Sequence, residues 1–155
     1  MSFQISALPA AHFKELAALS DSELGARNIQ KKTVESHRGY PCRVSLEDAE
    51  IGETIYLLNF THHDQATPYK ASHAIFVREG VEQAHPMTDE IPRSLSSRLL
   101  SVRAYDAHHD MVDADVCDGR QLGTKISTFF ADSAVVYLHL HNARPGCYAA
   151  RVDRI

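Results

Sequence analysis

The closing segment, residues 135–154, constrains the fold of this chain more than any other. Residues alternate in character from Val135 to His141, and Pro145-Gly146 then marks a turn before a second strand-like run. Because successive side chains of a strand point to opposite faces, this pattern predicts an antiparallel hairpin over 135–152. One face is expected to carry Val135, Tyr137, His139 and His141, and the other Val136, Leu138 and Leu140. Pro-Gly favours a type II turn, whose twist does not suit a two-residue hairpin loop, so the connection can exceed two residues.

The remaining patterns predict short strands and few helices. Strands are expected at 3–7, 54–61, 72–78, 99–105 and 111–117. Short helices are expected after Pro9, over 91–98 and after Asp118, and a further helix is expected to begin at the Ser20–Glu23 capping box and to end before Gly39. Clustered strands with few intervening helices favour an α+β fold, a largely antiparallel sheet with helices packed mainly on one face. At 155 residues the chain fits one domain, 1–155.

Composition excludes several classes of partner. The net charge is −4 and no run of Lys or Arg is present, which argues against nucleic acid. No apolar run reaches the ~18–20 residues of a membrane span, so we expect no membrane partner. Three cysteines form an odd set, and the first residues do not resemble a secretory leader. These features predict free thiols and a cytoplasmic location.

Histidine is the compositional outlier, with ten residues. His139 and His141 share a strand face at a spacing that metal sites on sheets use, and His62 or His63 could supply further ligands, as could His73. Imidazole and thiolate groups suit Zn²⁺ or another divalent metal. The alternative is that the apolar face of this strand covers the core while both histidines occupy a polar groove without metal.

The same hairpin offers a ligand pocket or a nucleophile. A pocket for a small molecule or anion would be lined by Tyr137, His139, His141, Cys147, His73 and Arg43, and Arg103, Arg144 and Arg151 could add positive charge. Cys147 could instead act as a nucleophile with His139 or His141 as base. Against this reading, free cysteine usually packs as a small buried hydrophobe. No complete catalytic motif is present, so enzymatic activity stays open.

Three functional hypotheses follow from these features. The first is a binding domain for a small molecule or anion, and the second is a metal-assisted or Cys/His-based enzyme centred on the 135–152 hairpin. The third is an interaction module that forms a homodimer through an exposed strand edge.

The chain also resembles the bacterial family known as domain of unknown function 1203. The resemblance rests on Gly39–Arg43, the Gly52–Phe60 stretch, Pro68-Tyr69 leading into Ser72–Val77, Leu100–Asp106 and the ending Tyr137–Arg154. It implies a single-domain cytosolic protein. It implies no activity, and it assigns no role to any residue.

Overall fold

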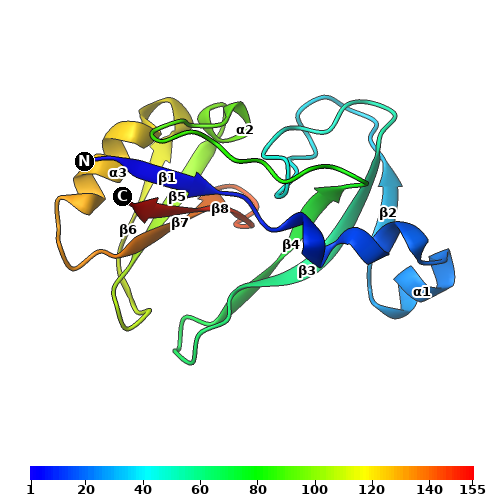
Figure 1. Cartoon of the computed structure of the whole chain (residues 1–155), viewed down its shortest axis with the longest axis horizontal. Helices are drawn as coiled ribbons and strands as arrows, with labels where there is room; N and C mark the ends of the chain where they lie inside the picture. The colour runs from blue at the N-terminus through cyan, green and yellow to red at the C-terminus, as the bar shows by residue number, and fades with distance from the viewer.

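The strands of the chain form two antiparallel sheets, as the computed structural model of all 155 residues shows (Figure 1). The larger sheet has the strand order β1-β8-β7-β5-β6, and the smaller has the order β2-β3-β4. The larger sheet contains β1 (Phe3–Ser6), β5 (Leu99–Tyr105), β6 (Met111–Asp118), β7 (Tyr137–Asn142) and β8 (Tyr148–Arg154). The smaller contains β2 (Gln30–Thr33), β3 (Thr54–His63) and β4 (Ala71–Arg78). The predicted α+β fold with antiparallel pairing is confirmed, and the division into two sheets was not predicted.

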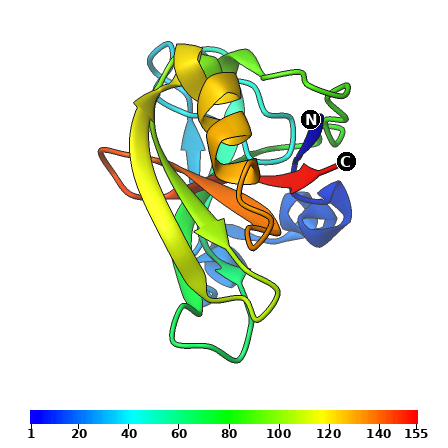
Figure 2. The ribbon, with the colours of Figure 1, turned by 90° about the vertical axis from the view of Figure 1, so that its left-hand side faces the viewer.

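The main core lies between the five-stranded sheet and helix α3 (Leu122–Phe130). Figure 2 shows α3 lying against this sheet. The helix buries the stripe that the sequence predicted, Leu122, Ile126, Phe129 and Phe130. These side chains pack against apolar residues of the sheet, among them Leu100, Val102, Leu138, Leu140 and Val152. Full burial of each such side chain contributes about 1.5–3 kcal/mol. This core fixes one face of β7 and leaves its other face free to carry polar groups.

The short helices differ from the predictions in detail. After Pro9 the chain forms two 3-10 helices, η1 (Ala10–His12) and η2 (Lys14–Ala18), and not an α-helix. Leu16 is their only buried residue, so no continuous apolar stripe stabilises an α-helix there. Helix α1 (Asp21–Ala26) begins at the predicted capping box, in which Ser20 and Glu23 bond each other's backbone N–H.

Helix α1 ends well before Gly39, where the sequence predicted its end, and β2 follows it. Every residue of β2 is exposed, so this edge strand lacks the apolar alternation that identifies a strand from sequence. Two further short helices are α2 (Arg93–Ser96) and η3 (Gly119–Gln121), and the predicted Asp118 cap bonds the backbone of Arg120 in η3. None of the helices is long and apolar enough to cross a membrane.

The closing hairpin consists of β7 and β8, joined by residues 143–147. This connection is longer than two residues, and Gly146 adopts a φ of +79°, which a type II turn requires at its third residue. The prediction for the residues before β7 is wrong. Val135 belongs to the main core with Leu138, whereas Val136 is 43% exposed. The strand begins only at Tyr137, so the alternation does not extend back to these two valines.

The segment around Arg43 joins the two sheets. The backbone N–H of Arg43 donates to the carbonyl of Phe76 in β4 (3.0 Å), and the backbone carbonyl of Arg43 accepts from the N–H of Leu8 (2.9 Å). Its side-chain Nε donates to the carbonyl of Tyr148 in β8 (2.7 Å). Arg43 therefore connects an edge of the smaller sheet to the closing hairpin, beside the inner faces of both sheets.

Candidate functional site

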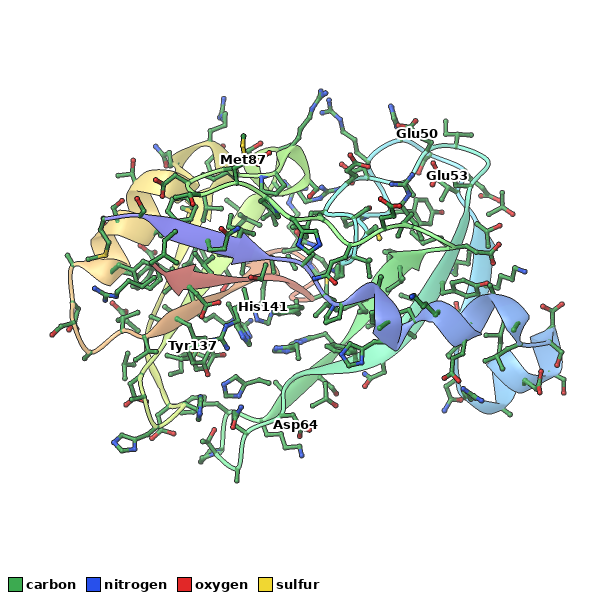
Figure 3. All side chains as sticks on the ribbon, in the orientation of Figure 1. Glu50, Glu53, Asp64, Met87, Tyr137 and His141 are labelled. Atoms are coloured by element: carbon green, nitrogen blue, oxygen red, sulfur yellow. The ribbon has the colours of Figure 1, made fainter.

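The inner face of the five-stranded sheet is polar and aromatic, and it faces the three-stranded sheet. Cross-strand pairing places three rows of side chains on it, which are Tyr105–Tyr137–Asp153, Arg103–His139–Arg151 and Ser101–His141–Tyr148. Figure 3 shows Tyr137 and His141 in the space between the two sheets. All six residues of β7 are buried, because the core covers one face and the smaller sheet covers the other. His139 and His141 thus share a face, as the alternation predicts.

A β-bulge directs two consecutive histidines of β3 toward this face. The register of β3 with β4 shifts between Thr61 and His63, so His62 has no direct partner on β4. In a regular strand adjacent side chains point to opposite faces, and a bulge re-aims one of them. As a result the ring of His62 stacks on Tyr148 (4.7 Å between centroids), and that of His63 stacks on Tyr105 (4.5 Å). Both rings therefore contact the larger sheet.

Four histidines from three strands meet at His62. Its Nε2 lies 2.7 Å from Nδ1 of His73, and its Nδ1 lies 3.3 Å from Nδ1 of His139. The ring of His141 meets those of His62 and His73 edge to face, with centroids 4.9 and 5.1 Å apart. One ligand nitrogen from each of His62, His73 and His141 lies within 4.8 Å of the other two. We call these three residues the histidine triplet.

Hydrogen bonding fixes the tautomer of His141. Its Nδ1 lies 3.0 Å from the carbonyl oxygen of Gly146. A carbonyl only accepts, so Nδ1 carries the proton and Nε2 of the neutral ring carries a lone pair. That Nε2 is buried and has no hydrogen-bond partner. An unsatisfied polar atom in a buried position is unusual and calls for an explanation.

Burial keeps the clustered imidazoles neutral. Loss of solvent, with a smaller contribution from neighbouring histidines, lowers the pKa of His139 to about 2. Burial likewise lowers the pKa values of His62 and His141 to about 3, in His141 against an opposing effect of the Gly146 carbonyl. The pKa of His73 is also lowered, first by burial and then by Arg103. Neutral imidazole is the form that binds metal ions.

A second hydrogen-bonded group adjoins the first. The hydroxyl of Tyr137 lies 2.8 Å from Nε2 of His63 and 3.0 Å from Nδ1 of His109, and the guanidinium of Arg151 lies over the Tyr137 ring at 3.9 Å. Burial raises the pKa of Tyr137 to about 12. The hydroxyl of Tyr137 therefore stays protonated, and Nδ1 of His63 is the one buried nitrogen of this group without a hydrogen-bond partner.

Arg43 is a buried cation without a carboxylate partner. The residue is 2% exposed, and its guanidinium donates to the carbonyls of Tyr148 and Pro41 and to Sγ of Cys147, the last at 3.0 Å. Burial lowers its pKa, and the sulfur of Cys147 acts in the opposite direction. Asn142 also donates to this sulfur, at 3.6 Å. The hydrogen-bond partners of Cys147 are therefore an arginine and an amide, and not the predicted histidine base.

A cavity of about 750 Å³ lies beside these groups. It is lined by residues of the 38–43 segment, of β3 and β4, of the 97–99 segment and of the hairpin connection. Its polar side chains include Arg38, Arg43, Arg98, Arg144, His73, Asn142 and Cys147, and none is a carboxylate. Arg98 forms an ion pair with Asp48, whereas Arg38 and Arg144 form none. Three of the four arginines of the cavity wall, Arg38, Arg43 and Arg144, therefore have no carboxylate partner.

The predicted site residues separate into two neighbouring groups. His73, Arg43 and Cys147 line the cavity, whereas Tyr137, His139 and His141 are buried and do not. His62 lies with His141, and His63 lies with Tyr137. The structure thus brings all of these side chains to the space between the sheets, with His73 common to the cavity and the histidine cluster.

Sequence reasoning missed several residues of this region. Tyr105 and Tyr148 stack on histidines, and His109 bonds Tyr137 although its sequence context is that of a surface turn. The signal for Tyr105 was present, because Ser101, Arg103 and Tyr105 alternate with apolar residues along β5. The cysteines are unpaired, as predicted, with Cys42 and Cys117 buried.

Comparison with known proteins agrees with the resemblance seen in the sequence. No curated protein and no solved structure matches the chain. The family model described as "Protein of unknown function (DUF1203)" matches residues 39–154, which include β3 to β8 and every side chain of the histidine cluster and the cavity except Arg38. The chain therefore belongs to the DUF1203 family.

Proposed function

We propose that the domain binds a small anionic molecule in the arginine-lined cavity. The observation that carries this proposal is the composition of the wall, which has four arginines and no carboxylate and in which only Arg98 is ion-paired. A buried guanidinium without a counter-ion is costly unless an anion compensates it, and Arg43 has only two carbonyls and a sulfur as partners. A cavity of about 750 Å³ is within the usual range for small-molecule sites.

Carboxylate and phosphate groups are the anions that the planar guanidinium of arginine recognises best. The guanidinium fork forms two parallel hydrogen bonds with either group. Arg144 and Arg38 have exposed side chains without ion-pair partners and can reorient toward a ligand. Asn142 adds a buried amide oxygen that has no hydrogen-bond partner and can accept from a ligand hydroxyl or amine.

Thermal unfolding and calorimetry with simple anions test the proposal. Inorganic phosphate and succinate are titrated at constant ionic strength, with chloride as the reference salt. Binding to the native state raises its stability by RT ln(1 + [L]/Kd), about 2.7 kcal/mol at one hundred times Kd. We expect saturable stabilisation by at least one of the two anions.

Two matched substitutions locate the binding site. Arg144→Gln removes one unpaired cavity cation and is expected to weaken binding about tenfold or more, the usual value of a charged hydrogen bond. Arg120→Gln removes an exposed arginine outside the cavity, and we expect unchanged affinity. Equal losses in both variants, or no saturable binding of either anion, would overturn the proposal.

The other two hypotheses stay predictions. The enzyme hypothesis gains one specific observation, the histidine triplet beside the cavity. The homodimer hypothesis is tested by light scattering at micromolar concentration, where a clean monomer would exclude it.

A further inference from the structure

The histidine cluster differs from an ordinary buried polar network because ring nitrogens of several imidazoles lie close together. Five histidines, His62, His63, His73, His139 and His141, lie in contact, and no carboxylate forms a hydrogen bond to any of them. A neutral imidazole has one donor and one acceptor nitrogen. The buried Nε2 of His141 has no donor to pair with, so the cluster holds an acceptor that its own groups leave unsatisfied.

We propose that His62, His73 and His141 bind one divalent transition-metal ion of the Zn²⁺ class. The nitrogens of His62 and His73 share one hydrogen in the metal-free protein, and a change of tautomer would free both lone pairs for the ion, beside the unpaired Nε2 of His141. Zn–N bonds of ~2.0–2.1 Å require ligand nitrogens about 3.3 Å apart in a tetrahedral site. Here the nitrogens of His62 and His73 are 2.7 Å apart and all three ligand nitrogens lie within 4.8 Å, so shifts of about 1 Å produce that geometry.

The surroundings of His141 resemble the support that metal-binding histidines have. Such a residue almost always donates its second ring N–H to a carbonyl or carboxylate, which fixes the tautomer and orients the ring. His141 makes this bond to the carbonyl of Gly146. The stack of His62 on Tyr148, with ring planes 8° apart, restricts the second ring in the same way. Two of the three ligands are therefore already oriented.

The number of ligands predicts an open site. Three histidines leave one tetrahedral position for water or a ligand, the arrangement of catalytic and not of structural zinc sites. His73 lines the arginine-rich cavity as well as belonging to the triplet, so the ion lies at the wall of that cavity. An anion held by Arg144 and Arg43 would be a neighbour of the metal. The metal site itself does not depend on anion binding.

Titration of the metal-free protein tests the inference. The protein is purified without a polyhistidine tag and treated with a chelator, and Co²⁺ and Zn²⁺ are added while visible absorption and heat are recorded. We expect one ion per chain and the intense visible bands of four-coordinate Co²⁺. Added Zn²⁺ should displace the Co²⁺ and abolish these bands. Binding in several weak steps without these bands would overturn the inference.

Matched variants separate the triplet from the other histidines. His73→Ala changes a partly exposed ligand, so we expect it to fold and to weaken binding at least about 100-fold, more than loss of an outer-shell partner typically does. His108→Ala removes an exposed histidine that has no side-chain contact with the cluster, and it is expected to bind as the unchanged protein does. Equal affinity in His73→Ala and the unchanged protein would overturn the assignment, whatever the result with phosphate or succinate.

Discussion

Acid should destabilise the metal-free protein well above the pH at which its carboxylates titrate. His139 and His141 are 2% and 0% exposed, and burial lowers their pKa values to about 2 and about 3. In the unfolded chain both titrate near ~6.5. Between these values the unfolded state binds more protons than the native state, so stability is complete above about pH 6.5 and falls as the pH decreases.

The magnitude follows from the same values. A histidine that stays neutral in the fold costs about 2 kcal/mol at about pH 5 relative to about pH 7. Two such residues give about 4 kcal/mol, and local opening of the cluster reduces this, so we expect about 2–4 kcal/mol. This is a large share of the ~5–15 kcal/mol that stabilises a typical domain.

Urea unfolding followed by circular dichroism, with chelator present, measures the effect at several pH values from about 7 to 5. His139→Gln should reduce the pH dependence by up to about 1.4 kcal/mol per pH unit, and His108→Gln, at an exposed position outside the cluster, is the matched control. An unfolding free energy that is the same at both ends of the range would refute the neutral-cluster explanation.

Two further predictions concern packing. Gly119→Ala should destabilise the protein by about 3 kcal/mol or more, because a Cβ would lie 2.1 Å from the carbonyl oxygen of Leu95. Gly25→Ala in helix α1, where nothing lies within 4 Å of the added Cβ, should stabilise the protein by about 0.5–1 kcal/mol. The midpoints of chemical denaturation of the two variants give the comparison. Leu140→Ala should cost about 2–5 kcal/mol, since its side chain is fully buried against α3, and a loss below 1 kcal/mol in chemical denaturation would contradict that packing.

The sequence predicted the faces of the hairpin but not what covers them. Alternation separated Leu138 and Leu140 from His139 and His141, because one face of β7 packs on the core. Periodicity contains no information on which strands pair or on a second sheet. The approach of His62 depends on a bulge, and a bulge adds one residue without any signature in the residues around it.

The cavity was still less predictable from sequence. Arg43 lies outside the eight strands; its backbone segment pairs with β4, and its side chain reaches the hairpin. The four arginines of the cavity wall are separated in sequence by up to 106 positions, from Arg38 to Arg144, so only the fold brings them together. Histidine enrichment indicated that a cluster was possible, and the three-dimensional arrangement determined its members.

The pairing of β1 with β8 has a practical consequence for truncated forms of this protein. Phe3 lies opposite Arg154 and Ile5 opposite Val152, so the two ends of the chain lie side by side at the outer edge of the larger sheet (Figure 1). The family match begins only at residue 39. A protein trimmed to that match would lack Phe3 and Ile5. The backbone N–H and C=O groups of β8 that pair with β1 would then be exposed, which favours strand pairing between molecules. Expression of this protein should therefore retain the residues before the match.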